Sequence, residues 1–207
     1  HAAGVIRNGL PLLNNTVPLH VMNLSSDLKT MLRPASPARR ALSRALPVLL
    51  VLAGWLLLWP AHDYQNHVAQ GDHGRDFYCY AAVLKGAVPF RDYWWVYGPI
   101  MPYYYAFFLK TLGLTMASIL AGEIVLKITA GFMIYRTVNL LCGKLWGCLA
   151  ALWFWSFYPY FFFTYNHTGG VALLTAMTFF LLRYIKTGSP ESLYPGLGCV
   201  FLLAFVK

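Results

Sequence analysis

The sequence is short of charged residues, and acidic ones are the scarcest. Of 207 residues, 11% are charged, and only 7 are Asp or Glu against 16 Lys or Arg. Soluble domains carry about 25% charged residues. Because so few charges could not cover the surface of a water-soluble globule, the composition excludes a soluble enzyme. The 58% share of hydrophobic residues also excludes a disordered chain, except at the N-terminus.

Cysteine is also scarce, and no CxxC pair or other metal-binding spacing is present. The four cysteines are Cys79, Cys142, Cys148 and Cys199. Three of them lie in or beside apolar runs, which is typical of small buried hydrophobic side chains. A redox or zinc motif is therefore not expected.

The net charge of +9 does not indicate a nucleic-acid partner. Nucleic-acid binding would need basic residues along one exposed face. Here Lys and Arg gather in short clusters beside apolar runs, and that distribution fixes the topology of membrane proteins. The partner expected from charge is a lipid bilayer, with no nucleic acid.

Long apolar runs, in contrast, recur along the chain. The first covers residues 46–61 and follows a basic cluster (Arg39, Arg40, Arg44) that would lie on the cytoplasmic side. A cleaved signal peptide is the competing interpretation, but no small-residue cleavage site follows the run. Further spans are predicted over residues 115–135, 146–163, 168–185 and 193–207. The stretch 99–113 is short and holds two prolines and a lysine, so a re-entrant or interfacial helix is expected there.

These runs predict an all-α integral membrane protein, a polytopic helical bundle with amphipathic interfacial helices in its first outer loop. Residues 1–44 would form a partly disordered cytoplasmic tail. Residues 45–207 would form the N-terminal part of a multi-span membrane domain that is truncated at its C-terminus. Its outer loop, residues 62–98, would lie on the non-cytoplasmic side.

The outer loop differs in kind from the apolar runs. It holds four of the seven acidic residues: Asp63, Asp72, Asp76 and Asp92. Residues 76–85 (DFYCYAAVLK) have the apolar spacing of an amphipathic helix at a membrane interface, and Gly86 would end that helix. Three histidines also lie in the loop: His62, His67 and His73. Their spacing from Asp63 and Asp72 fits no closed metal site, which favours a solvated loop.

Residues 73–113 (HGRDFYCYAAVLKGAVPFRDYWWVYGPIMPYYYAFFLKTLG) show an ordered set of features. In order, these are Asp76, Gly86, Pro89-Phe90-Arg91-Asp92-Tyr93, Gly98-Pro99 and Leu112-Gly113. The set resembles the first outer loop of the polytopic C-type glycosyltransferases, which include the protein O-mannosyltransferases and the lipid A aminoarabinose transferases. The hairpin predicted over residues 146–185 agrees with that family in layout.

The resemblance implies an enzyme that transfers a sugar from a polyprenyl-phosphate carrier to an acceptor, with inversion at the anomeric carbon. The reaction would take place on the non-cytoplasmic face of a bacterial inner membrane. It needs a base to deprotonate the acceptor. It also needs a cationic partner for the leaving phosphate, either a basic side chain or a divalent metal ion.

Asp76 matches the family's loop acid and is the candidate catalytic base, in a wet pocket at the outer leaflet. The competing interpretation is an N-cap of the helix. Arg75 and Arg91 are the candidate phosphate partners, because a guanidinium binds phosphate oxygens bidentately. Anchoring to lipid headgroups is their alternative role. Asp92 would contact substrate or metal, or would pair with Arg91 to hold a turn.

The predicted hairpin tip supplies two further candidates, Asn166 and His167. Many relatives present an acidic residue there. His167 could bind a metal or hydrogen-bond a sugar or phosphate, or could serve as a polar residue at the start of the helix from Thr168. Two departures leave the donor sugar open. Phe77 follows Asp76 where mannosyl relatives have a second acid, and Gly98 precedes Pro99 where aminoarabinose relatives have lysine.

Glu123 and Lys127 lie four residues apart in a predicted span. Charges within membrane helices often mark functional sites, although an i, i+4 pair that satisfies itself is the simpler account. A secondary transporter would place this pair on its transport path and would show inverted repeats. No internal repeat is found. A non-catalytic membrane scaffold of the same fold is the third possibility.

Overall fold

The structure is a computed structural model that describes residues 37–58, 72–157 and 165–206. Within these ranges all regular structure is helical, apart from an isolated bridge between Pro89 and Tyr93. The expected all-α class is therefore confirmed. The chain divides into two units between Ser43 and Arg44. The second unit contains most of the first described helix and all of the others.

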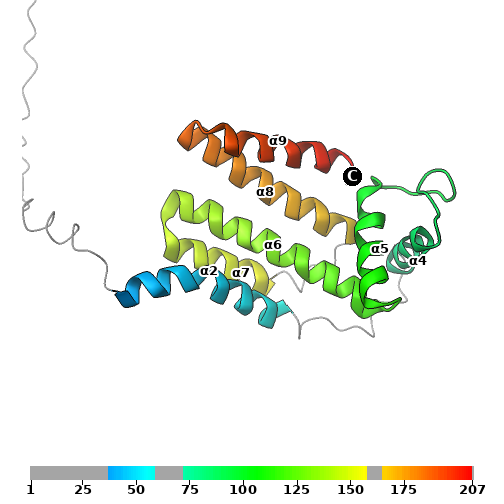
Figure 1. The fold of residues 1–207 in the computed structure, drawn as a ribbon, viewed down its shortest axis with the longest axis horizontal. Helices are drawn as coiled ribbons and strands as arrows, with labels where there is room; N and C mark the ends of the chain where they lie inside the picture. Colours follow the sequence, from blue (N-terminus) through cyan, green and yellow to red (C-terminus); the bar gives the residue numbers. More distant parts are fainter. Residues whose placement is uncertain (1–36, 59–71, 158–164, 207) are drawn as a thin grey trace, which may run out of the picture. The chain divides into compact units, whose positions relative to one another are not determined.

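Seven helices lie in the described ranges (Figure 1). They are α2 (Pro37–Leu58), α4 (Asp72–Leu84), α5 (Ile100–Leu112), α6 (Met116–Cys142), α7 (Lys144–Phe157), α8 (Tyr165–Thr187) and α9 (Pro190–Ala204). By length and composition, α2, α6 and α8 could each cross a membrane. Helices α5, α7 and α9 have 13, 14 and 15 residues. A span needs about 20 residues, so the described parts of the spans predicted at α7 and α9 are shorter than expected.

Several helix boundaries differ from the predictions. Helix α2 begins at Pro37, inside the segment predicted as a tail, because the Ala-, Arg- and Leu-rich sequence before the apolar run favours helix and proline is suited to its first position. Helix α6 continues past residue 135 to Cys142, since Arg136 does not interrupt a helix. Helix α4 begins four residues before Asp76 and ends before Gly86, which has a positive φ of 87°. The interpretation of Asp76 as an N-cap is therefore wrong.

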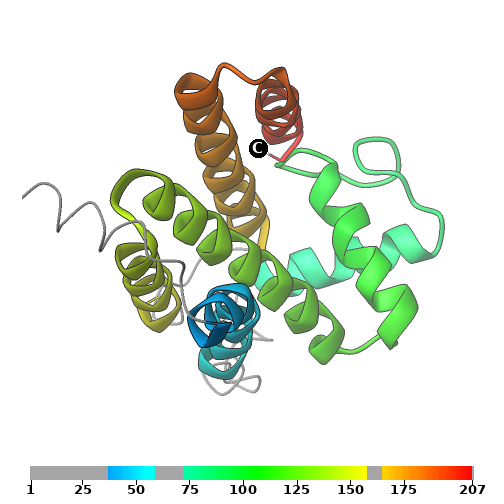
Figure 2. The same cartoon turned by 60° about the vertical axis from the view of Figure 1, so that its left-hand side comes forward.

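Helix α6 is the shared partner of α5, α7 and α8. Helix α7 packs on α6, α8 packs on α6 as well, and α9 packs on α8 (Figure 2). The two helices of the hairpin predicted over residues 146–185 both pack on α6, and α8 packs on α9 as well. Residues 158–164, which join them, lie outside the described ranges.

Trp155 of α7 packs against both α2 and α6. Its indole nitrogen donates a hydrogen bond to the carbonyl oxygen of Lys127 at 2.9 Å. The ring lies directly against Gly54 of α2 and Gly131 of α6, where any side chain would collide with it. The two glycines therefore permit the close packing of this part of the bundle.

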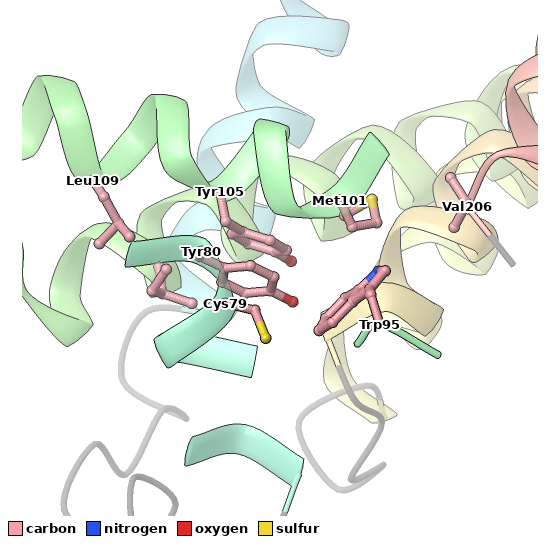
Figure 3. Close-up of a cluster of buried hydrophobic side chains, with 8 residues drawn as sticks. Cys79, Tyr80, Trp95, Met101, Tyr105, Leu109 and Val206 are labelled. Carbon is pink, nitrogen blue, oxygen red and sulfur yellow. The ribbon is translucent and has the colours of Figure 1, made fainter. Parts of the chain in front are cut away.

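Helices α4 and α5 pack against each other, and α5 contacts the N-terminal part of α6 (Figure 1). The buried face of α4 includes Cys79 and Tyr80, and the ring of Tyr80 stacks on Tyr105 of α5 with centroids 4.8 Å apart. Trp95, from the segment between these helices, and Val206, beyond α9, join the same cluster (Figure 3). This cluster supports the site described next.

Candidate functional site

Asp76 lies in the second turn of α4, and its side chain is fully buried. Its Oδ1 accepts hydrogen bonds from Nε and Nη2 of Arg75 at 3.2 and 3.0 Å. Its Oδ2 accepts one from Nδ2 of Asn166 at 3.3 Å. The predicted wet pocket is therefore wrong, because the first turn of α8 and the Arg75 side chain cover the carboxylate.

Arg75 links the carboxylate to an aromatic wall. Its guanidinium carbon lies 5.8 Å from the ring centroid of Trp95 and 5.9 Å from that of Tyr97, within the range of cation–π attraction. The Arg75 side chain is one-third exposed. The Tyr97 ring also meets the His167 ring edge-on, with centroids 5.7 Å apart. Side chains from α4, from α8 and from the segment between α4 and α5 therefore lie around the Arg75 guanidinium.

Four of the predicted site residues are therefore brought together: Arg75, Asp76, Asn166 and His167. Asn166 and His167 are not at a loop tip, as predicted, but in the first turn of α8. Asn166 is buried and His167 half-buried. The buried Oδ1 of Asn166 has no hydrogen-bond partner among the described residues. This polar atom is a free acceptor directly beside the Asp76 carboxylate.

Arg91 and Asp92 form a separate, exposed pair. Nε and Nη2 of Arg91 donate to the two carboxylate oxygens at 2.9 and 2.7 Å, and the backbone amide of Val88 donates to Asp92 at 2.8 Å. The hydrogen bond from Arg91, reinforced by the one from Val88, lowers the pKa of Asp92 to about 2. These contacts are those of the turn-holding pair considered from the sequence, and a substrate contact by either residue stays a prediction.

A second buried polar group surrounds Glu123 of α6. Its Oε2 accepts a hydrogen bond from the Tyr105 hydroxyl and its Oε1 accepts one from the Thr168 hydroxyl, both at 2.7 Å. Lys127 Nζ lies 3.4 Å from the same Oε1. The predicted i, i+4 pair is confirmed, but it is not self-contained. Tyr105 and Thr168 lie 18 and 45 residues away in sequence, and no sequence signal marked them.

Burial shifts the ionisation of two side chains in this region. It raises the pKa of Tyr105 well above its usual value, and the Glu123 carboxylate raises it further, so the phenol stays a hydrogen-bond donor. Burial also raises the pKa of the Cys79 thiol, and the nearby Asp76 adds to the rise. Cys79 therefore remains an uncharged thiol beside the site.

Among the described residues, the donors around Asp76 do not favour a divalent metal ion, and the metal ion considered from the sequence stays a prediction. Its carboxylate faces the Arg75 guanidinium, whose positive charge would repel a cation. In the described parts of the chain, no three His, Cys, Asp or Glu side chains are grouped as metal ligands. Of the histidine–aspartate group seen in the sequence, residues 62–67 lie outside the described ranges.

Comparison of this chain with known protein families, curated proteins and solved structures finds no match. The resemblance seen in residues 73–113 therefore stays a prediction. The geometry around Asp76 is the independent observation on which a function can be argued.

Proposed function

We propose that this chain is part of a membrane glycosyltransferase that transfers a sugar from a polyprenyl-phosphate carrier to an acceptor hydroxyl on the non-cytoplasmic face. The observation that supports the proposal is the buried Asp76 carboxylate, which is held between the guanidinium of Arg75 and the first turn of α8. This cluster combines a carboxylate, a cation and the Asn166 amide, and α8, which carries the amide, is long and apolar enough to cross a membrane.

In the proposed reaction, Asp76 takes the proton of the acceptor hydroxyl. The acceptor oxygen forms its bond to the anomeric carbon as the bond from that carbon to the phosphate oxygen breaks, and polyprenyl phosphate leaves with the electron pair. The hydroxyl reaches Asp76 by replacing the Asn166 amide at Oδ2, whose hydrogen bond is longer than those from Arg75.

Arg75 would bind the phosphate of the sugar donor. Its side chain is one-third exposed although its partner is fully buried, so an incoming anion can reach it. A phosphate that draws the guanidinium away from Asp76 leaves the carboxylate without its cation, which makes it a stronger base. Donor binding would in this way prepare the base for the acceptor.

A transporter would instead use Glu123 and Lys127 on an ion path. Their contacts favour the enzyme, because Tyr105 of α5 and Thr168 of α8 occupy both oxygens of Glu123. Such a junction of three helices is typical of packing rather than of an open path.

The test uses the full-length protein of which this chain is proposed to be part, in liposomes with a panel of radiolabelled polyprenyl-phosphate sugars that carry mannose, glucose or aminoarabinose. We expect transfer by the unaltered chain and a loss of about 10²–10⁴-fold in Asp76→Asn, which is the usual contribution of a general base. Glu191→Gln, which removes an exposed carboxylate in the first turn of α9, should leave the rate unchanged. Full activity of Asp76→Asn, or no transfer from any donor, would overturn the proposal.

The side of the membrane is tested separately. Tyr78 is 69% exposed on α4, so Tyr78→Cys in a chain lacking the native cysteines gives an accessible label near the site. A membrane-impermeant thiol reagent should reach it from the non-cytoplasmic side. Labelling from the cytoplasmic side alone would reverse the proposed topology.

A further inference from the structure

We infer that Glu123 is a positioning residue that sets the geometry of Asp76 through two helices at once. Each oxygen of its buried carboxylate holds a hydroxyl from a different helix, and each of those helices leads to Asp76. The catalytic consequence of this inference rests on the proposed function, whereas its structural part does not.

The first connection runs through α8. Oε1 of Glu123 accepts the hydrogen bond of Thr168 at 2.7 Å. Thr168 lies two residues after Asn166 in the same helical turn, and Asn166 donates to Asp76. A helical turn is held by its own backbone hydrogen bonds. Fixing the Thr168 hydroxyl on α6 therefore fixes the position of the Asn166 amide at the carboxylate.

The second connection runs through α5 and α4. Oε2 of Glu123 accepts the hydrogen bond of Tyr105 at 2.7 Å, and the Tyr105 ring stacks on Tyr80 (Figure 3). Tyr80 lies four residues after Asp76, on the same face of α4. The stack therefore sets how α4 presents Asp76 to the first turn of α8.

Stability alone does not account for a charged group at this position. Removing two charges from water carries a large desolvation cost, and apolar residues of similar volume often stabilise a core equally well. A carboxylate with two directional acceptors does what an apolar side chain cannot, since it fixes the register of α5 and α8 on α6 together. That register is what places Asn166 opposite Asp76.

Two nearly isosteric variants remove one connection each. Thr168→Val breaks the connection through α8, and Tyr105→Phe breaks the connection through α5. Each has a matched control on its own helix. The Thr178 hydroxyl bonds only to the Leu174 carbonyl one turn earlier, and Tyr103 is exposed, so Thr178→Val and Tyr103→Phe leave the junction intact.

The first measurement needs no enzymatic activity. Cys79 is 3% exposed and lies three residues after Asp76, so its rate of modification by a maleimide reports how firmly α4 is held. In the full chain with Ala at the other three cysteines, we expect Thr168→Val and Tyr105→Phe to label about tenfold faster, since each lacks a hydrogen bond to a charged group. Thr168→Ser, which keeps the hydroxyl, should restore the slow rate, and both controls should label slowly.

The second measurement is sugar transfer. A shift of α4 against the first turn of α8 would misplace Asp76 relative to the acceptor and should lower kcat about tenfold. It should change KM for the donor little, because Trp95 and Tyr97 still hold the Arg75 guanidinium. Equal Cys79 labelling in variants and controls would overturn the positioning role, whether or not the chain transfers sugar. Faster labelling together with an inactive unaltered chain would support the positioning role and remove the proposed function.

Discussion

The chain contains two Arg-Asp dipeptides, Arg75-Asp76 on α4 and Arg91-Asp92 in the following loop, and in both the arginine binds the neighbouring carboxylate. The two pairs differ in how far the carboxylate is buried and in which other residues bind it. Asp76 is fully buried and also accepts a hydrogen bond from a residue 90 positions away. Asp92 keeps 36% of its side chain exposed, and its remaining partner is four positions away. The same dipeptide thus forms part of a site in one place and closes a turn in the other.

The segment that follows the exposed pair and leads into α5 offers the largest expected effect. Trp95 is 2% exposed, donates to the Gly98 carbonyl and faces Arg75, whereas its neighbour Trp94 is 78% exposed. Trp95→Ala should cost about 3–5 kcal/mol of unfolding free energy because it leaves a large cavity behind the Asp76 pair. Trp94→Ala should change it by less than about 0.5 kcal/mol, as exposed substitutions usually do.

Thermal unfolding of the full chain in detergent, followed through modification of Cys79, measures both tryptophan variants. If both variants lost the same unfolding free energy, the contact of Trp95 with the buried Arg75-Asp76 pair would not be what stabilises this segment.

The arginines themselves give the next largest difference. Arg75→Ala leaves a buried carboxylate without its cation, which should cost about 2–3 kcal/mol, a figure reduced from that of fully buried pairs because Arg75 is one-third exposed. Arg91→Ala removes an exposed pair that solvent and salt screen, so its melting temperature should match that of the unaltered chain.

Melting temperatures of the two arginine variants, measured at low and at high salt, sharpen the contrast. The loss in Arg75→Ala should persist at high salt because its partner is buried. If the fall in melting temperature of Arg75→Ala became smaller at high salt, the Arg75-Asp76 pair would be screened by solvent as the exposed Arg91-Asp92 pair is.

The smallest expected effect is on the stability that the Arg91-Asp92 pair adds at low pH. The pKa of Asp92 is lowered from 3.8 to about 2, so the stability that this pair adds is present above about pH 4 and is lost as the pH falls through 2. Arg91→Gln should raise the pKa of Asp92 toward 3.8 without reaching it, because the Val88 amide still donates. Carboxyl ¹³C NMR against pH measures this shift, and an unchanged titration would show that Arg91 is not its main cause.

The sequence predicted the helical class and the approximate place of each described helix, because apolar periodicity and glycine breaks are local signals. The helix starts were less well predicted. Helix α4 begins at Asp72, and its polar first turn carries no apolar signal. The partners of the helices were also missed, since nothing in residues 146–185 shows that both α7 and α8 pack on α6.

For the site, the sequence identified residues by type but could not tell which of them meet. Asp76, Asn166 and His167 were selected and do lie together. Arg91 and Asp92 were selected with equal justification and lie in an exposed turn. The hydroxyl groups that donate to Glu123, from Tyr105 and Thr168, were not predicted. Tyrosine and threonine are common in such helices, and their role depends on how α5 and α8 cross α6.

The length of α6 has a consequence for how a bilayer would hold the molecule. Its 27 residues rise about 40 Å, whereas the hydrocarbon layer is about 30 Å thick. If α6 crosses a bilayer, the helix has to tilt or project from the hydrocarbon, and a thicker or thinner bilayer would change the balance. Glu123 and Lys127 lie in the first half of α6, so an N-terminal projection would raise them toward the headgroups, where hydrating a charge costs least. Hydrophobic mismatch would then set the depth of the junction in the lipid.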